Sequence, residues 1–143
     1  MIRSMTREDV KAVAVIEAAA FSEPWSEKSL EETLEKDEYL YLVAEEEGQV
    51  LGYVGVHMVF DEGEITTIAV REDIRDRGIG RSLLQEMKGQ CKSRGIAVIY
   101  LEVRASNARA IHVYEKEGFV KNGVRKNFYR MPVEDACCMA ANL

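Results

Sequence analysis

The stretch that decides the fold is GEITTIAVREDIRDRGIGRSLL, residues 63–84. Its first eight residues form a largely apolar alternating run, which predicts a β-strand that ends at Val70. Two glycines, Gly78 and Gly80, then precede a run with helical spacing. Glycine allows main-chain N–H groups to close on an anion, and the dipole of the helix that follows favours negative charge there. A strand, a glycine-rich turn and a helix in this order therefore predict a phosphate-binding cradle.

The bare pattern of this cradle, a basic residue followed by x-x-Gly-x-Gly, is weak evidence on its own. Because glycine makes up roughly 7% of residues, a chain of this length contains the pattern by chance about once in ten to twenty sequences. The pattern gains weight because it follows a predicted strand and opens a predicted helix. The elements around it are therefore as informative as the glycines.

The composition is that of a globular protein with an acidic balance. Of 143 residues, 47% are hydrophobic and 31% are charged, and the net charge is −6. This length suits one domain, residues 1–143. No run of about 18 apolar residues occurs and the first ten residues lack the core of a signal peptide, so we expect a cytoplasmic protein with no membrane span. The acidic balance disfavours a nucleic-acid groove and suits a cationic partner.

The three cysteines, Cys91, Cys137 and Cys138, form neither a disulfide pattern nor a metal-binding pattern. Their number is odd, no C-x-x-C spacing occurs, and adjacent residues of a strand point to opposite faces. We therefore expect no metal site and predict that the cysteines are packing residues, with a reactive thiol as the alternative.

Before the cradle, helical spacing gives way to alternating apolar runs. Thr6 and Asp9 form a capping pair ahead of one helix, and Ser26, after Pro24, is the predicted cap of a second. Turn residues separate the strands that follow, which predicts an antiparallel meander. The predicted elements are a short strand at residues 2–3, helices over 7–19 and after Ser26, and strands over 39–45, 50–60 and 64–70.

After the cradle, a helix ends near Gly95 and the short run AVIYLEV follows at residues 97–103. Its apolar character predicts a strand covered on both faces, and the strand-helix-strand crossover predicts parallel pairing with residues 64–70. Asn107 is the predicted cap of a further helix, which ends at Gly118. Strands over residues 120–129 and 134–142 complete the predicted sheet.

The whole chain resembles the GCN5-related N-acetyltransferases (GNAT). The predicted order β-α-α-β-β-β-α-β-α-β-β is that of this family, and Arg75, Gly78 and Gly80 match its acetyl-coenzyme A motif. LEVRASNARAIHVYEKEGF (101–119) also resembles the family, and FSEPWSEKSL (21–30) and RKNFYR (125–130) look like segments of the bacterial ribosomal-protein-alanine N-acetyltransferases. The resemblance implies an α/β (α+β) GNAT fold, with a mixed six- or seven-stranded sheet and about four helices.

The resemblance further implies acetyl-coenzyme A as cosubstrate and the N-terminal alanine amine of a small-subunit ribosomal protein as acceptor. Main-chain N–H groups of the cradle would surround the pyrophosphate, Arg77 and Arg81 could add charge-assisted contacts, and the Asp76 side chain would turn to solvent. The residues implied in cofactor binding are Ile68, Ala69, Val70, Asp76, Arg77, Gly78, Ile79, Gly80, Arg81 and Asn107.

Glu102 is the predicted general base. It stands at the C-terminal end of the predicted parallel strand, where ligands of open α/β sheets gather, and the family assigns the base to the matching position. A carboxylate there can take the proton of an amine directly or through water. The alternative is a structural ion pair with Arg104 or Arg75.

Tyr114 is the predicted general acid for the departing thiolate. It lies two helical turns after Asn107 on the same face, so its phenol can approach the sulfur while Asn107 contacts the pantetheine arm. The alternative for Tyr114 is an aromatic ring packed on the sheet. His112 is another candidate acid, but it is turned roughly 200° around the helix and is predicted to face solvent.

Trp25 and Tyr129 are the predicted substrate-binding residues, because both match substrate-facing segments of the subfamily. Trp25 could instead fill the core. An α-amine with a pKa near 8 is about a tenth neutral at pH 7, whereas a lysine amine is neutral in about one molecule in a few thousand, so an α-amine needs the weaker base. A lysine or polyamine acetyltransferase and a non-catalytic coenzyme A sensor are the alternatives.

Overall fold

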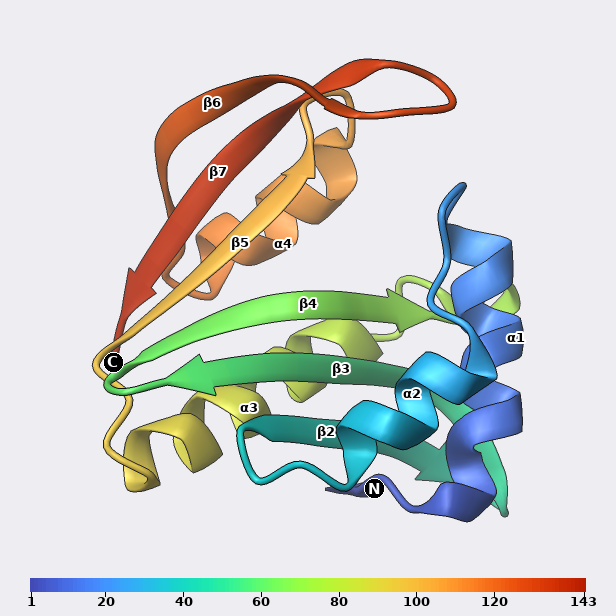
Figure 1. Ribbon diagram of the computed structural model, residues 1–143. Coiled ribbons are helices and arrows are strands. Elements are labelled where there is room, and N and C mark those ends of the chain that lie inside the picture. Colours follow the sequence, from blue (N-terminus) through green and yellow to red (C-terminus); the bar gives the residue numbers. More distant parts are fainter.

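The computed structural model describes residues 1–143 and contains one mixed seven-stranded sheet, in the order β1-β2-β3-β4-β5-β7-β6 (Figure 1). The predicted element order and fold class are confirmed, with short 3-10 turns at Arg7–Asp9 and Glu72–Ile74 in addition. The elements are β1 (Ile2–Ser4), α1 (Val10–Ala20), α2 (Glu27–Leu34), β2 (Tyr39–Glu46), β3 (Gln49–Val59), β4 (Glu62–Val70), α3 (Ile79–Ser93), β5 (Val98–Arg104), α4 (Ala108–Lys116), β6 (Val120–Tyr129) and β7 (Glu134–Asn142).

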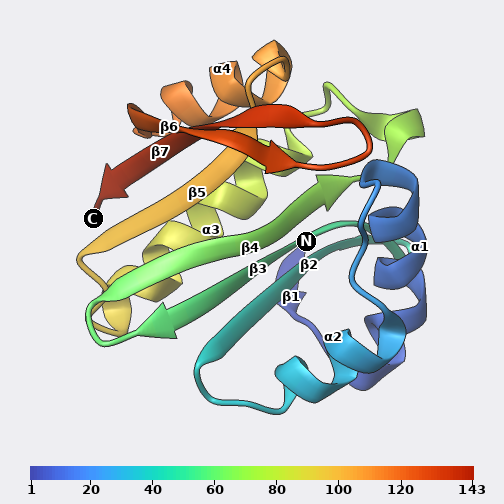
Figure 2. The same cartoon turned by 45° about the horizontal axis from the view of Figure 1, so that its top comes forward.

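Helices cover both faces of the sheet (Figures 1 and 2). α1 and α2 lie on one face, over β2, β3 and β4, and we call this the α1 face; α3 and α4 lie on the other. The alternation of side chains along β2 fills both cores. Leu42 belongs to the core with Leu83 and Met87 of α3, and Val43 belongs to the core with Val13 of α1. Each such side chain, once fully buried, contributes about 1.5–3 kcal/mol relative to exposure.

β4 and β5 pair only at one end and then separate. Their parallel register covers Glu62 to Glu64 against Val98 to Tyr100. Beyond that point β4 stays with β3 and β5 stays with β7, and Figure 1 shows the two strands diverging. A register shift at Gly55 and Val56 of β3 leaves Thr66 as an extra residue of β4, and a bulge of this kind bends the strand. The sheet is therefore split at the predicted active site.

The prediction that β5 is covered on both faces is wrong. Ile99, Leu101 and Val103 are buried against α3 and α4, but Tyr100 and Glu102 point to the α1 face and remain partly exposed. α1 and α2 extend only as far as β4, so no helix covers β5 on this side. The apolar character of the sequence comes from the large residues on the buried face alone. The other face of the strand lies open beside the gap next to β4.

None of the helices has the length and apolar character required to cross a bilayer. The three cysteines are free thiols, and Cys91 and Cys137 are buried. Burial raises the pKa of Cys91 to about 11, which keeps it a protonated thiol at neutral pH. These two cysteines are packing residues, as predicted.

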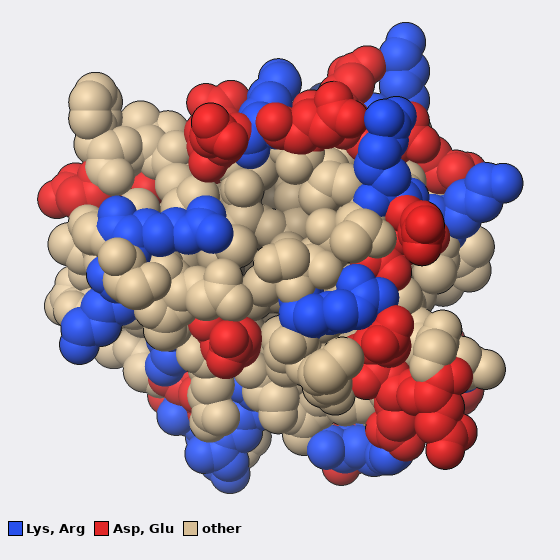
Figure 3. Space-filling model, turned by 90° about the horizontal axis from the view of Figure 1, so that it is seen from below, with Lys and Arg blue, Asp and Glu red and all other residues tan.

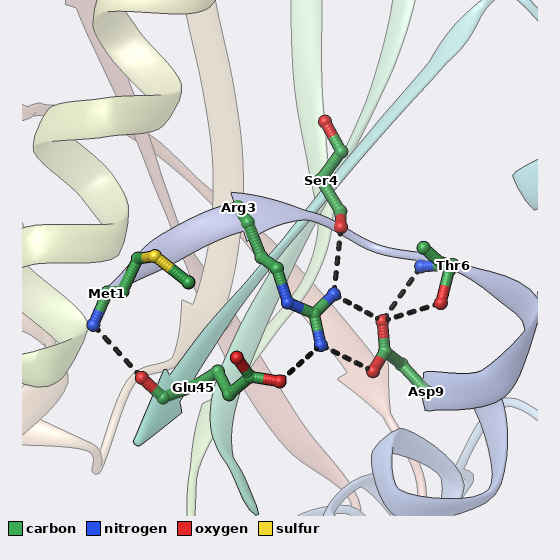
Figure 4. Close-up of polar contacts among 6 residues, drawn as sticks. All are labelled: Met1, Arg3, Ser4, Thr6, Asp9 and Glu45. Atoms are coloured by element: carbon green, nitrogen blue, oxygen red, sulfur yellow. Dashed lines mark hydrogen bonds and ion pairs between the residues drawn. The ribbon is translucent and has the colours of Figure 1, made fainter. Parts of the chain in front are cut away.

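The edge strand β1 is held by a cluster of charged groups (Figure 4). The Arg3 guanidinium donates to Asp9 at 2.7 and 2.9 Å and to Glu45 at 2.8 Å. The main-chain N–H of Thr6 donates to Asp9 at 2.8 Å, so the predicted capping pair is confirmed. The Arg3 contacts lower the pKa of Asp9, and desolvation of this carboxyl opposes them.

Replacing Asp9 with Asn is expected to lower the free energy of unfolding at pH 7 by about 1–3 kcal/mol, because charge-assisted hydrogen bonds to Arg3 are lost. The lowered pKa means that the contribution of Asp9 is present above the ordinary aspartate range and is lost as pH falls through the folded-state value. Urea unfolding from pH 7 down to about pH 2 should therefore show the two proteins converging in acid. Glu8→Gln, at an exposed site on the same turn, is the control. A difference that stays constant with pH contradicts this role for Asp9.

Candidate active site

A cavity of about 430 Å³ lies where the end of β4, the start of α3 and the inner face of α4 meet. It is lined by all the predicted cofactor-binding residues except Arg77, and by Tyr114. Arg77 instead points toward Glu46, with its Nη2 atom 3.5 Å from the carboxylate. The predicted cofactor residues brought together are Ile68, Ala69, Val70, Asp76, Gly78, Ile79, Gly80, Arg81 and Asn107.

The cradle is built by a left-handed glycine at the start of α3. Gly78 has φ +79° and is the N-cap of the helix. Its carbonyl accepts the first helical hydrogen bond, from Ser82 N–H at 3.0 Å. The first N–H groups of an α-helix have no partner within the helix, so those of the first turn are free to bind an anion. The first turn of α3 also lines the cavity.

Replacing Gly78 with Ala is expected to raise the acetyl-coenzyme A dissociation constant about tenfold, because the left-handed conformation costs an L-residue about 1–2 kcal/mol and the cradle would shift to relieve it. Gly89→Ala is a matched control. Both sites have open space around an added Cβ atom, but only Gly78 has a positive φ. Calorimetric titration should find Gly89→Ala unchanged in affinity, with a stability gain of up to about 1 kcal/mol in mid-helix. Equal affinities of the two variants for acetyl-coenzyme A would show that the left-handed conformation of Gly78 does not contribute to cofactor binding.

Charged side chains surround the mouth of the cavity. Asp76 is 78% exposed, as predicted, and it also forms an ion pair with Arg109 of α4. Arg81 donates from Nε to the buried carboxylate of Glu117 at 2.6 Å, so part of its guanidinium is already engaged. Lys88 lies 3.7 Å from the same carboxylate. Ion pairs thus join α3 to the residue that follows α4, and α4 to the loop that precedes α3. No spacing in the sequence indicated Arg109.

The strand β4 presents an unpaired main-chain edge to the gap. Its other edge pairs with β3 as far as Val70, but its pairing with β5 ends at Glu64. The N–H and C=O groups of Ile68, Ala69 and Val70 on the open side therefore have no strand partner. Buried main-chain groups require partners, so this edge suits an extended molecule that carries amides.

Glu102 lies on the open face of β5, beside this gap. Its side chain is 15% exposed, and its Oε1 atom is 3.9 Å from Nε of Arg125. Burial and then the charge of Glu64 raise its pKa, and Arg125 opposes them. The predicted alternative, an ion pair with Arg104 or Arg75, is wrong because the structure pairs Glu102 with Arg125 and directs Arg104 to Glu134. The pair with Arg125 is long and half-exposed, so the carboxylate can still accept a proton.

Tyr114 and Tyr129 flank the same gap. Burial raises the pKa of Tyr114, and Tyr129 adds to the shift. Burial and then Glu102 raise the pKa of Tyr129 to about 12. The ring of Tyr114 also packs edge-on against Phe119 with 5.8 Å between centroids, and the residue still lines the cavity.

Two residues near Tyr114 behave as predicted. The side-chain oxygen of Asn107 accepts from Ala110 N–H at 3.2 Å, which confirms it as the cap of α4. This bond leaves the amide NH₂ group of Asn107 available to a ligand. His112 is exposed, as expected from its position on the helix, although it borders the cavity on the outside.

Two loops meet above the gap (Figure 2). Ser22, in the loop between α1 and α2, donates to the carbonyl of Arg130 at 3.2 Å. Arg104 donates to Ser22 at 3.3 Å, to the Arg130 carbonyl at 3.0 Å and to Glu134 at 3.2 Å. Its guanidinium also lies 4.6 Å from the ring centre of Tyr129. Arg104 therefore joins both loops to the end of β5, a role that its sequence position did not reveal.

Trp25 is placed outside the cavity. It is partly buried against the core on the α1 face, and its main-chain N–H donates to Glu17 at 3.1 Å. Phe21, from the same loop, lines the cavity instead and was not predicted. Glu17 was also not predicted. The sequence did carry a signal for it, a charged residue on the apolar stripe that Val10 and Val13 define. The substrate role of Trp25 remains a prediction.

A second hollow, of about 690 Å³, lies between α1, the β2–β3 turn and the residues after β4, and contains none of the predicted catalytic residues. No group of His, Cys, Asp and Glu side chains is arranged to hold a metal ion. On the face seen in Figure 3, basic side chains stand among acidic ones and form no continuous basic surface. The second hollow and the charged face therefore leave the candidate site in the cavity between β4, α3 and α4.

Comparison with known proteins agrees with this geometry. Residues 10–119 match the model of the acetyltransferase (GNAT) family. The chain is 37% identical to the ribosomal protein bS18-alanine N-acetyltransferase of Escherichia coli, over 97% of this chain and 95% of the relative. It is 33% identical to N-alpha-acetyltransferase RimI of Mycobacterium tuberculosis, over 96% and 89%. The crystal structure of the ribosomal-protein-S18-alanine N-acetyltransferase from Escherichia coli has a TM-score of 0.91 at 36% identity and covers 99% of this chain and 92% of its own. The chain therefore belongs to the GNAT family of N-acetyltransferases.

Proposed function

We propose that this protein transfers the acetyl group of acetyl-coenzyme A to the N-terminal alanine amine of a small-subunit ribosomal protein. The observation that carries this proposal is the gap beside β4, where a partly buried carboxylate, Glu102, and a buried phenol, Tyr114, flank an unpaired main-chain edge. The Escherichia coli relative is named for the alanine of ribosomal protein bS18, which supports the acceptor.

The residues of the cavity fit acetyl-coenzyme A. Members of this family use acetyl-coenzyme A as the acetyl donor. The free N–H groups at the start of α3 suit the pyrophosphate, and the open main-chain edge of Ile68, Ala69 and Val70 suits the amides of the pantetheine arm. The free amide group of Asn107 can donate to the same arm. No metal ion is needed for these contacts.

The chemistry asks three things of this chain. Glu102 accepts the proton of the acceptor amine, directly or through water, as the amine nitrogen bonds to the acetyl carbon. Main-chain N–H groups of β4 donate to the acetyl oxygen as negative charge develops on it. Tyr114 donates its proton to the sulfur as the carbon–sulfur bond breaks. Because its pKa is raised, Tyr114 holds that proton throughout the physiological range.

The charge of the chain favours a basic acceptor. Its net charge is −6, and the open face of the gap carries Glu64 and Glu102. A basic tail behind the acceptor alanine would be attracted to such a surface. We place the reaction in the cytoplasm, where ribosomal proteins are made. A lysine or polyamine acceptor uses the same residues, and a silent coenzyme A sensor uses the cradle alone.

Mass spectrometry of a panel of acceptors tests the proposal. Peptides that begin Ala-Arg, the same peptides with a blocked N-terminus, and small polyamines are incubated with acetyl-coenzyme A and the protein. One acetyl group on the α-amine of the first peptide is expected. Modification of lysine alone, or a clear preference for polyamines, contradicts the proposed acceptor, and binding of acetyl-coenzyme A without turnover identifies a sensor.

A further inference from the structure

Glu17 is a buried carboxylate that the proposed chemistry does not use. It lies on α1 and faces the sheet, and only 2% of the residue is exposed. None of the ion pairs in the structure includes it, so its hydrogen bonds alone offset its burial. A buried charge is retained at considerable cost unless its hydrogen bonds are satisfied, and a well-packed hydrophobic residue would often be as stable.

Three donors from three different elements converge on Glu17. Its Oε1 atom accepts from the phenol of Tyr53 on β3 and from the hydroxyl of Thr67 on β4. Its Oε2 atom accepts from the main-chain N–H of Trp25 at 3.1 Å. Burial, followed by the charge of Glu17, raises the pKa of Tyr53, so this phenol keeps its proton and remains a donor. No other hydrogen bond from the main chain of the α1–α2 loop reaches the carboxylate.

The partners of Glu17 connect the two sides of the active site. Thr67 directly precedes Ile68, whose main chain faces the gap, and Thr67 is itself fixed by register against Gly55 of β3. Trp25 lies in the loop that begins with Phe21 in the cavity wall and bonds through Ser22 to the β6–β7 loop. One carboxylate thus ties the loop above the gap to the strand that lines it.

We propose that Glu17 is a positioning residue that holds the α1–α2 loop against β4 and so sets the acceptor side of the active site. The inference rests on the proposed acceptor site, which includes Trp25. The hydrogen bonds of Glu17, rather than its volume, do the positioning. Leucine at this position should therefore preserve folding and loosen the loop. Glutamine should preserve folding and also keep the loop in place, because its oxygen can accept from Trp25 and its NH₂ group can donate to Tyr53.

The chain offers a direct probe of the loop, because Trp25 is its single tryptophan. Glu17→Leu, Glu17→Gln and the wild-type protein are compared by acrylamide quenching of Trp25 fluorescence, which needs neither cofactor nor acceptor. Steady-state kinetics with the Ala-Arg peptide, the dissociation constant of acetyl-coenzyme A and thermal unfolding are measured on the same proteins. Glu32→Leu is the matched control, because Glu32 is an exposed carboxylate on α2 with no hydrogen-bond or ion-pair partner.

For Glu17→Leu we expect the quenching constant to rise about twofold and the peptide KM to rise about tenfold, since small misplacements of substrate-positioning groups have effects of this order or larger. The dissociation constant of acetyl-coenzyme A should stay within about twofold, because β3 still holds β4. Glu17→Gln and Glu32→Leu should match the wild type. Thr67→Val, which removes one donor at constant volume, should give an intermediate rise and serves as the second variant if Glu17→Leu unfolds.

Unchanged quenching and peptide KM in Glu17→Leu would overturn the proposal, as would a Glu17→Gln variant as impaired as Glu17→Leu. An equal loss in cofactor affinity would also overturn it, because the effect would not be confined to the acceptor side. A third outcome separates the two proposals: the wild-type protein acetylates no peptide, but Glu17→Leu still shows raised quenching. This outcome would contradict the proposed function and would still support the role of Glu17 in anchoring the loop.

Discussion

Replacing Glu102 with Gln is expected to lower kcat by about 10²–10⁴-fold, the usual contribution of a positioned general base. The amide cannot take the amine proton, but it retains the size of the side chain. The dissociation constant of acetyl-coenzyme A should be unchanged, because Glu102 lies on β5 and the cradle is built by β4 and α3. Single-turnover kinetics with the Ala-Arg peptide measure the chemical step. A loss smaller than about fivefold would return Glu102 to a structural role.

The pH dependence of kcat/KM provides a second measurement on Glu102. The reaction needs an ionised carboxylate and a neutral amine, so activity falls as pH falls, and it falls more steeply below the pKa of Glu102. Because burial and Glu64 raise that pKa, the steeper limb should begin above the ordinary glutamate range. Glu64→Gln should move this limb to lower pH without abolishing activity, since it removes a like charge. In Glu102→Gln the steeper limb should be absent.

Replacing Tyr114 with Phe is expected to lower kcat by about 10²-fold, because the departing sulfur loses its proton donor. The ring that packs against Phe119 is kept, so the free energy of unfolding should change by less than about 1.5 kcal/mol. Rapid-quench measurement of acetyl transfer, together with urea unfolding, separates the two effects. A variant with full activity would leave Tyr114 as a packed aromatic residue only.

His112→Ala is the matched control for Tyr114→Phe. His112 is exposed on the same helix, two residues before Tyr114, and its loss should change kcat by less than about twofold. The pH dependence of kcat is a second test of Tyr114. Because burial raises its pKa, Tyr114 keeps its proton as pH rises through neutrality, so kcat should not decline over that range. A decline in kcat as pH rises through neutrality would contradict Tyr114 as the general acid.

The periodicities of the sequence predicted every helix and strand, and most boundaries moved by two residues or fewer. The largest boundary changes are local in origin. The first helix was expected from residue 7, but residues Arg7–Asp9 form a 3-10 turn before α1, because the Asp9 side chain caps this end and is held by Arg3. Such a contact joins β1 to the helix start and leaves no trace in helical spacing.

The prediction for β5 was wrong for a different reason. Apolar composition indicates that a strand is buried, but it does not say on how many faces. Ile99, Leu101 and Val103 account for the apolar character, while the residues between them face an open gap. Only the extent of the helices on the α1 face decides whether that side is covered. Which charged residues form ion pairs, such as Glu102 with Arg125, likewise depends on how the elements pack in the tertiary structure.

The sequence by itself determined the order of elements, the cradle and the residue types available for acyl transfer. These follow from local rules: side-chain periodicity, helix capping and the conformational freedom of Gly78. The tertiary structure decided where β4 and β5 part, which loops close above the gap, and that Glu17 meets donors from β3, β4 and the α1–α2 loop. Those features join residues as many as 108 positions apart, as Ser22 and Arg130 are, so they depend on how the layers pack and not on any local pattern.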